Sequence, residues 1–277
     1  MDLRWKNNPA LWDALYQSNK VFAFSDLHAQ KISSVVVNII EAPKHLRELS
    51  GEIEDFWGRF AEQHSSAYNG KILAATGLDA LTFHGEEVII EAFISDYATS
   101  IFKSTALKNS QNLSEEQRYF FQSRFFAVGA SGYSHILDEY LLGLRTDRGP
   151  ADRLAGMVQY LPQGFTSVNE DNGNSMDATI SRELKEETHL DIALDCATKE
   201  ITHILLGELN GDFSIIYNLT LKPESREKIY ADAEEIERVF FSPLSEIKMQ
   251  LSEQKTRRLF SPVTVSVFES ISVPEHL

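Results

Sequence analysis

The alternation of apolar and polar positions along the chain predicts a series of short strands and amphipathic helices. Apolar runs rich in β-branched residues and bounded by turn formers predict strands over residues 31–40, 71–78, 87–94, 139–145, 157–161, 201–209, 213–221 and 236–241. Apolar residues spaced three or four positions apart predict helices over residues 46–64, 114–127, 243–250 and 255–270. Residues 1–30 show no clean period and give no assignment.

Two antiparallel hairpins are expected among these strands. One joins residues 71–78 to residues 87–94 through His84-Gly85, and residues 96–102 then continue or cap its second strand. The other hairpin crosses Asn210-Gly211-Asp212, a strong turn signal between two apolar runs.

The helix predicted from residue 114 begins with a capping box, because Ser114 is followed three positions later by Gln117. Its aromatic residues indicate burial or an interface with a second subunit, so a homodimer is one assembly that we expect. The small residues Gly129-Ala130-Ser131-Gly132 follow, and we expect the seam between the two halves of the chain there.

An acidic stretch from Arg182 to Leu190 reads R-E-L-K-E-E-T-H-L. On a helix that turns about 100° per residue, Glu183, Glu186 and Glu187 fall within one arc of roughly 100°. Like charges placed so closely cost a few tenths of a kcal/mol unless something neutralises them. A purely oxygen ligand set favours a hard cation such as Mg²⁺ or Mn²⁺. The alternative is an ordinary acidic face exposed to solvent.

The residues before this stretch narrow the choice. Gly164 follows Leu161-Pro162-Gln163, and Glu170 lies after five intervening residues. Together with R-E-L-K-E-E and Leu190, this pattern resembles the Nudix box, G-x5-E-x7-R-E-U-x-E-E-x-G-U, in which U is aliphatic. From average composition, the R-E-U-x-E-E-x-x-U core should occur by chance in roughly one chain in several thousand.

Two features depart from the box. The segment between Glu170 and Arg182 is four residues longer than the box allows. The extra residues read as a loop, after which Asn174 or Ser175 can cap the acidic helix. The insertion leaves the helix intact and the role of Glu170 open. The second departure is His189 in place of the Gly that normally adopts a left-handed conformation after the helix, which His adopts at modest cost.

The resemblance implies an α+β fold, a Nudix α/β/α sandwich with a mixed sheet, over residues 131–277. Residues 1–130 would form a smaller α/β extension that serves substrate recognition or dimerisation. That extension is faintly similar to the N-terminal extension of eukaryotic UDP-glucose/UDP-galactose Nudix diphosphatases. The implied reaction hydrolyses the diphosphate bond of a nucleoside diphosphate linked to another moiety, such as a UDP-sugar. Its products are a nucleoside monophosphate and a phosphorylated moiety.

The resemblance also assigns roles to the residues that match the box. It implies that Glu183, Glu186 and Glu187, together with the backbone of Gly164, hold Mg²⁺ or Mn²⁺. Glu183 and Glu187 would thereby be catalytic, with Glu187 the ligand least able to be replaced. Arg182 would support catalysis by fixing one carboxylate through a charge-assisted hydrogen bond.

Residues outside the box complete the expected site. Many Nudix enzymes take a further acid from a later loop, and the candidates here are Glu234, Glu235 and Glu237, of which we favour Glu235 as catalytic base or ligand. A solvated turn explains three neighbouring acids equally well. Arg145 and Arg148, near the end of a predicted strand, are candidates for pairing with the substrate phosphates, although both could be surface charges.

Composition and charge restrict the partners. The chain has 277 residues, of which 43% are hydrophobic, and a formal net charge of −15. An anionic chain is a poor non-specific nucleic-acid binder, and it suits a small nucleotide substrate that arrives with its metal ion. No apolar run approaches the roughly 20 residues that span a bilayer, so we expect no membrane partner. The single Cys196 excludes an internal disulfide and agrees with a reducing cytoplasm.

Two other interpretations stay open at this point. A Nudix-fold module that binds or senses a nucleotide without cleaving it predicts binding without phosphate release. An unrelated α+β protein with a solvated acidic helix predicts no metal-dependent thermal shift, because such a shift requires a ligand that binds the folded state. The sequence identifies neither the base and the linked moiety, nor the general base, nor the oligomeric state.

Overall fold

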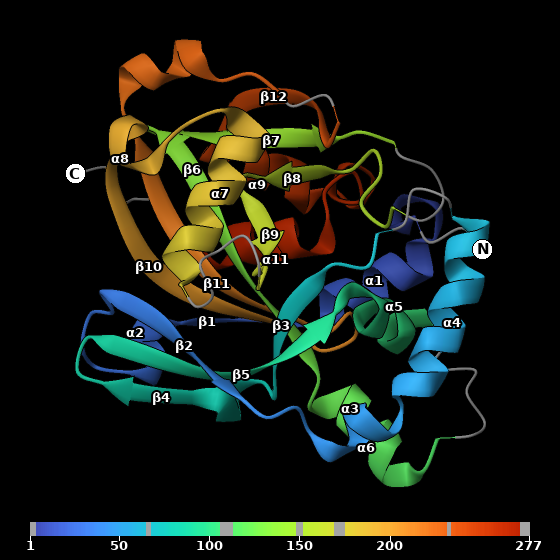
Figure 1. Cartoon of the computed structure of the whole chain (residues 1–277). Helices are drawn as coiled ribbons and strands as arrows, with labels where there is room; N and C mark the ends of the chain where they lie inside the picture. The colour runs from blue at the N-terminus through green and yellow to red at the C-terminus, as the bar shows by residue number, and fades with distance from the viewer. Residues whose placement is uncertain are drawn as a thin grey trace.

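One mixed sheet runs through both halves of the chain (Figure 1). The computed structural model describes residues 4–64, 68–105, 113–147, 152–168, 175–231 and 234–271. The strands are β1 (Asn19–Ala23), β2 (Ser34–Ile40), β3 (Lys71–Ala75), β4 (Leu81–His84), β5 (Glu87–Asp96), β6 (Phe126–Ile136), β7 (Glu139–Arg145), β8 (Val158–Tyr160), β9 (Gln163–Phe165), β10 (Cys196–Gly207), β11 (Asp212–Leu221) and β12 (Ile236–Pro243). The α-helices are α1 (Pro9–Ser18), α2 (Phe24–Leu27), α3 (Lys44–Glu48), α4 (Ser50–Gln63), α5 (Tyr97–Thr105), α6 (Glu115–Ser123), α7 (Met176–Thr188), α8 (Ile192–Asp195), α9 (Leu244–Ser252), α10 (Gln254–Arg257) and α11 (Pro262–Ser270). Short 3₁₀ turns cover Trp5–Asn7, Leu78–Ala80 and Pro223–Lys228.

The sheet is organised around β6. Its main path has the order β1-β10-β11-β6-β3-β5-β2, and β6 also pairs with β7 and β9. The β6/β11 and β2/β5 pairs are parallel, whereas β10/β11, β3/β5 and β7/β12 are antiparallel. This curled mixed sheet with flanking helices confirms the expected α+β class. Among the described residues, no helix combines the length and apolarity needed to cross a membrane.

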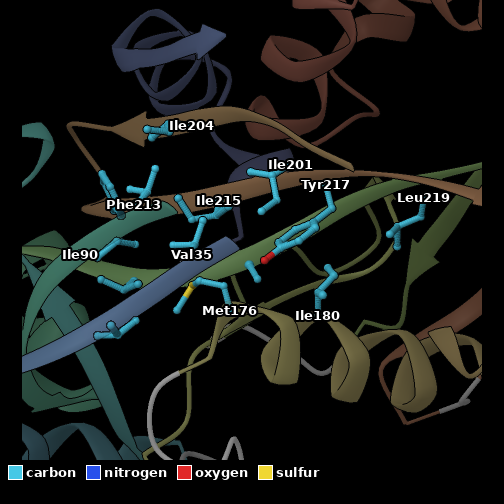
Figure 2. Packing of buried hydrophobic residues seen from close by; sticks show 14 of the residues in the cluster. Val35, Ile90, Met176, Ile180, Ile201, Ile204, Phe213, Ile215, Tyr217 and Leu219 are labelled. Carbon is cyan, nitrogen blue, oxygen red and sulfur yellow. The ribbon is translucent and has the colours of Figure 1, made fainter. Parts of the chain in front are cut away.

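Both faces of the sheet are covered, as alternate residues of β11 show. Ile215 and Tyr217 belong to the core under α7, where they pack with Ile180 of that helix (Figure 2). Ile216, between them, belongs to a second core that includes Phe268 of α11. Alternation of this kind follows from the two-residue repeat of a strand. Full burial of each such side chain stabilises the fold by about 1.5–3 kcal/mol.

The two halves of the sequence share these layers. β1 pairs with β10, with Asn19 opposite Gly207. The indole of Trp12 on α1 donates to the carbonyl of Phe260 at 2.9 Å. The expected seam, Gly129-Ala130-Ser131-Gly132, lies inside β6, which pairs with β11 over residues 127–135. A division into residues 1–130 and 131–277 therefore stays a prediction about folding units, and its boundary falls within a strand.

Most predicted elements are present, with local differences. The helix predicted over residues 255–270 is divided into α10 and α11, and strand β4 lies between β3 and β5 and forms the hairpin at Gly85. Ser114 and Gln117 form the expected capping box at the start of α6. That helix ends at Ser123 rather than near residue 127, because the chain then enters β6. Residues from Tyr97 onward form helix α5 instead of continuing β5. Asp96 causes this change, since its carboxylate accepts from the backbone and the hydroxyl of Thr99.

Candidate functional site

The acidic stretch lies on α7, whose apolar side packs onto the sheet. Ile180 and Leu184 are fully buried in the core there. Ser175 caps the helix, with its hydroxyl accepting from the backbone of Ala178 at 3.4 Å. His189 ends the helix in the expected left-handed conformation, with φ 62° and ψ 14°. The capped and anchored helix therefore fixes the positions from which its glutamates extend toward β8 and β9.

Two of the three glutamates are enclosed. Glu183 retains 7% of its exposure and Glu187 only 1%. Glu187 accepts from the backbone of Gln163 at 3.0 Å and from the side-chain amide of Gln159 at 3.2 Å. Such donors are required, because an enclosed carboxylate without partners would lose its hydration without compensation. Glu186 lies at the edge, with 55% of its side chain exposed.

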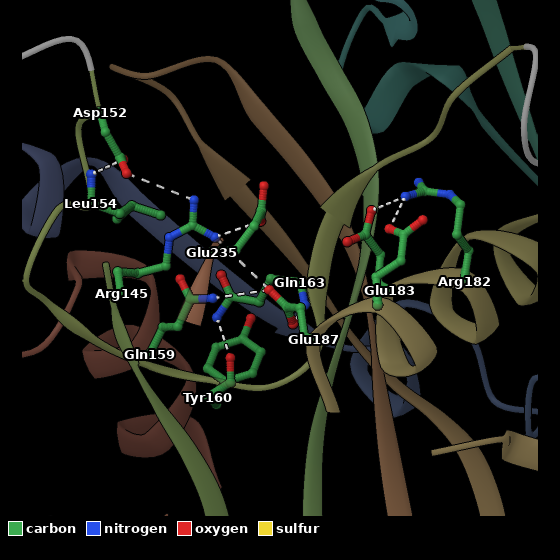
Figure 3. Close-up of polar contacts among 11 residues, drawn as sticks. Arg145, Asp152, Leu154, Gln159, Tyr160, Gln163, Arg182, Glu183, Glu187 and Glu235 are labelled. Atoms are coloured by element: carbon green, nitrogen blue, oxygen red, sulfur yellow. Dashed lines mark hydrogen bonds and ion pairs between the residues drawn. The ribbon is translucent and has the colours of Figure 1, made fainter. Parts of the chain in front are cut away.

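Arg182 ties α7 to β9. One of its terminal nitrogens lies 2.7 Å from Glu183 Oε1 and 2.8 Å from Glu186 Oε2. The other donates to the carbonyl of Phe165 at 3.0 Å. Figure 3 shows this guanidinium facing Glu183 at one side of the site. Charge-assisted bonds of this kind orient a carboxylate strongly, and this is the contact that we expected of Arg182.

Two glycines allow the layers of the site to approach closely. A Cβ atom at Gly164 would lie 1.7 Å from Oε1 of Glu183, so the carboxylate occupies the space of a side chain on β9. A Cβ atom at Gly129 would lie 2.5 Å from the carbonyl oxygen of Gly164, so β9 in turn rests on β6. Any larger residue at either position would push β9 or the glutamate aside.

Arg145 connects the acidic helix to the segment that precedes β12. Its guanidinium lies 2.9 Å from Glu235 Oε2, 4.0 Å from Glu187 Oε1 and 3.9 Å from Asp152 Oδ2. These side chains surround it in Figure 3. The structure thus places Glu235 beside Glu187 through a shared arginine. A phosphate-binding role for Arg145 stays a prediction.

Burial raises the pKa of both enclosed glutamates. Desolvation raises the pKa of Glu183 to about 8, although Arg182 lowers it and Glu186 adds to the rise. Desolvation also raises the pKa of Glu187 well above its usual range, with Glu183 adding to the effect and Arg145 opposing it. The cations of the chain therefore do not fully offset this carboxylate pair, and an additional positive charge beside it would be favourable.

These groups line a cleft of about 710 Å³. Its floor is the face of the sheet turned away from α7, where Ala127, Gly129 and Ser131 alternate along β6. Their small size makes room in a sheet that is otherwise covered. The first half of the chain lines the same cleft, through Phe60, Tyr68, Gly70, Ile72 and Tyr97. A volume of this order is typical of small-molecule sites.

The donor chemistry of the site fits a hard divalent cation. Carboxylate and carbonyl oxygens are the ligands that Mg²⁺ and Mn²⁺ prefer, and the carboxylate of Glu183 lies against the backbone of Gly164 here. The described residues nevertheless contain no group of three His, Cys, Asp or Glu side chains already arranged around one point. Glu186, the most exposed of the three acids, bonds to Arg182 at 2.8 Å.

No protein-family model and no curated protein matches the chain. Solved structures similar to parts of it include a NUDIX hydrolase from Nitrosomonas europaea, with 18% identity over 52% of this chain and 86% of that chain and a TM-score of 0.34. An ADP-ribose pyrophosphatase from Streptococcus suis has 17% identity over 43% of this chain and 75% of that chain, with a TM-score of 0.30. A bifunctional NMN adenylyltransferase/ADP ribose pyrophosphatase from Francisella tularensis, complexed with AMP and a Mn ion, has 15% identity. It aligns over 61% of this chain and 44% of that chain, with a TM-score of 0.39.

The structure brings most of the predicted site residues to one cleft. Its lining includes Gly164, Arg145, Arg182, Glu183, Glu186, Glu187, Glu234 and Glu235. Glu237 is exposed and does not line the cleft. Arg148, Glu170 and Asn174 lie outside the described residues.

Several polar residues of the cleft were not anticipated. Gln159 and Tyr160 lie on β8, and the Tyr160 hydroxyl donates to Ser131 at 2.9 Å. Their signal in the sequence is a polar residue inside a short apolar run, which the strand prediction passed over. Asp152 and Asp212 also line the cleft. Asp212 belongs to the predicted turn Asn210-Gly211-Asp212, and a turn by itself explains an aspartate there.

Proposed function

We propose that this protein hydrolyses the diphosphate bond of a nucleoside diphosphate linked to another moiety, with Mg²⁺ or Mn²⁺ as cofactor. The observation that supports this most directly is the buried pair Glu183 and Glu187 beside Gly164, at one end of a cleft of nucleotide-compatible size. The products would be a nucleoside monophosphate and a phosphorylated moiety.

In this proposal the ligands are carboxylate oxygens of Glu183, Glu186 and Glu187 and the backbone of Gly164. Mg²⁺ or Mn²⁺ held by them supplies the positive charge that offsets the negative oxygens of a diphosphate. The chain prepares this site in advance, since Glu187 is fixed by two hydrogen bonds and Glu183 by Arg182. Glu186 lies at the exposed edge of the site, with 55% of its side chain accessible to solvent.

The remaining residues orient these acids and handle the proton. Arg145 holds Glu235 at 2.9 Å and lies beside Glu187, so it sets the distance between a helix acid and a loop acid. Glu235 keeps 43% of its side chain exposed, and we assign it as the base that takes a proton from the attacking water. Arg145 and Arg148 are our candidates for pairing with the phosphate oxygens.

The substrate that we propose to test first is a UDP-sugar. The faint similarity of the first half to the extension of UDP-sugar diphosphatases motivates this choice. Phe60 and Tyr97 of that half line the cleft and present flat surfaces against which a base or a sugar ring can pack. Trp57 packs against both rings. Its centroid lies 5.3 Å from that of Phe60, in a stacked arrangement, and 6.3 Å from that of Tyr97, edge to face.

The decisive experiment measures nucleoside monophosphate release from a panel of nucleoside diphosphate derivatives with Mg²⁺ or Mn²⁺. Glu187→Gln should lower kcat/KM by at least about a hundredfold, because it removes a charged oxygen at the centre of the site. Glu200→Gln is the matched control, since this partly exposed carboxylate pairs only with Lys31 among the described residues, at 2.7 Å. Such a pair contributes little, so activity should be unchanged.

Other outcomes point to the other interpretations. Equal activity in wild type and Glu187→Gln would refute the metal assignment. Nucleotide binding without any release would favour a sensing module. If the metal ions left the thermal unfolding midpoint unchanged, an ordinary acidic helix would be the better explanation.

A further inference from the structure

The cleft reaches from the glutamates to another carboxylate, Asp212, at the opposite end of its floor. Asp212 begins β11 and pairs with Ala127 of β6. Gly164, against which Glu183 lies, pairs with Ala130 of the same strand. These two levels are three residues apart along β6, which corresponds to about 10 Å. One ligand of nucleotide length can therefore reach both ends.

The carboxylate of Asp212 is oriented but not saturated. Its Oδ2 accepts from the side-chain amide of Asn210. Its Oδ1 accepts no hydrogen bond from any residue that the structure describes. Ser214, two positions along β11, and Ser131 of β6 share the same face and line the cleft with their hydroxyls 3.0 Å apart. This end of the cleft is therefore polar, and one oxygen of the Asp212 carboxylate is available to a ligand.

The nearby cations Arg153 and Lys103 influence the pKa of Asp212 but do not donate hydrogen bonds to it. Desolvation raises the pKa of Asp212 to about 6, and the charges of Arg153 and Lys103 oppose the rise. Asp212 is therefore ionised at neutral pH. The hydrogen bonds of the two cations go elsewhere, from Lys103 to the carbonyl of Phe125 at 2.6 Å and from Arg153 to the hydroxyl of Ser104.

Arg153 and Lys103 already place positive charge near Asp212, so uncharged hydrogen-bond donors are better partners for it than a further cation. An ionised carboxylate cannot donate a hydrogen bond to phosphate, so the diphosphate of a bound substrate is directed to the other end of the cleft. Two adjacent hydroxyl groups satisfy it best, because a carboxylate has acceptor sites on both oxygens and bonds to a charged acceptor are strong. Sugars supply such adjacent hydroxyls.

We propose, on the basis of the function above, that Asp212 is a specificity residue that accepts hydrogen bonds from a vicinal diol of the substrate. The diol belongs either to the ribose of the nucleoside or to a sugar linked to it. In both cases Asp212 fixes the orientation of the substrate, with its diphosphate beside Glu183.

The test is isothermal titration with Mg²⁺ present. Its ligands are monophosphates, which lack the diphosphate bond that the proposed reaction cleaves, so binding is measured separately from hydrolysis. One arm compares UMP and AMP with their 2′,3′-dideoxy forms, and the other compares glucose 1-phosphate with 2,3-dideoxyglucose 1-phosphate. Wild type should bind a diol-bearing ligand at least about tenfold more tightly than its dideoxy partner, because loss of the hydroxyls leaves a partly buried acceptor unpaired. The arm that shows this difference identifies which sugar lies at Asp212.

Asp212→Asn should bring the two affinities of that pair to within about twofold of each other, since the charged acceptor is lost. Asp138→Asn, at an exposed turn outside the cleft, should keep the wild-type difference. Thermal unfolding checks that each variant is folded. Should Asp212→Asn not fold, Ser214→Leu serves instead. It fills the floor beside Asp212 and should weaken the diol-bearing ligand at least about tenfold.

The proposal is overturned if folded Asp212→Asn keeps the diol preference, if Ser214→Leu binds as wild type does, or if wild type shows no preference in either arm. Absence of binding by all the ligands overturns it as well. These results are independent of the proposed reaction. Hydrolysis without diol preference removes only the role of Asp212, whereas diol preference without hydrolysis removes only the enzyme assignment.

Discussion

At the scale of single residues, the candidate site depends on a glycine, because Gly164 has no side chain. Gly164 leaves the space in which the carboxylate of Glu183 lies. The acids themselves could be predicted, because Glu183, Glu186 and Glu187 are neighbours on one helix and their spacing is local. Their partners could not be predicted in the same way. Arg145 meets Glu187 and Glu235 only after the sheet has formed, and no local pattern encodes that contact.

Gly164→Ala should lower kcat/KM for the diphosphate substrate by about a hundredfold. The added methyl group would lie 1.7 Å from Glu183 Oε1, and a displacement of about 1 Å in a catalytic group costs about this much. Steady-state kinetics measure the effect. Gly58→Ala is the control, because a Cβ atom there meets nothing within 4 Å. In mid-helix it should stabilise the protein by up to about 1 kcal/mol and leave kinetics unchanged. Full activity in Gly164→Ala would show that Glu183 is not needed where it lies.

Lys103 should make stability depend on pH in the alkaline range. Burial lowers the pKa of this side chain to about 7, against the opposing charges of Asp212 and Glu208. Between pH 7 and about 10 the unfolded state binds a proton that the folded state does not. The free energy of unfolding should therefore rise with pH, by up to about 1.4 kcal/mol per unit.

Urea denaturation at several pH values tests this contribution. Lys103→Met should flatten the rise, because the titrating group is gone. Lys31→Met should not, since Lys31 lies on the surface in an exposed pair with Glu200. An unchanged slope in Lys103→Met would mean that another group causes the dependence.

At the scale of elements, prediction succeeded where the determining signal was local. The β10–β11 hairpin and the caps of α6 and α7 all follow from a few adjacent residues. The sequence did not predict strand β6, because its central glycines and serine resemble a linker. β6 is buried on both faces and its small residues suit the cleft and the close approach of β9. Such a strand lacks the alternation of a half-exposed one.

Ser114→Ala should destabilise the protein by about 1 kcal/mol, because it removes the hydroxyl that caps α6. Urea denaturation measures the loss as a lower midpoint concentration, provided that the dependence of the unfolding free energy on urea concentration is unchanged. Ser33→Ala is a suitable comparison, since the exposed Ser33 hydroxyl makes, among the described residues, only a long bond of 3.3 Å to the carbonyl of Glu86. Equal stability of the two variants would show that α6 is held by its buried aromatic residues and not by its cap.

At the scale of the whole molecule, the two halves of the sequence build one sheet and one cleft. β1 and α1 belong to the layers of the second half, and β6 begins before residue 131. We therefore expect a fragment of residues 131–277 to lack cooperative thermal unfolding, because it loses the first part of β6 and also β1, one of the two strands that pair with β10. Circular dichroism of the fragment and of the full chain tests this. A sharp transition in the fragment would establish it as an autonomous domain.

The pairing of β1 with β10 has a consequence for biosynthesis. Asn19 leaves the ribosome early, but its partner Gly207 is translated only after most of the chain has been made. Until then a strand with unsatisfied edges and the apolar side of α1 have nothing to cover them. Contacts between such distant segments slow folding, and exposed edges in unfinished chains favour aggregation. Slower translation should therefore lower the yield of native protein, and chaperones that shield nascent chains should restore it.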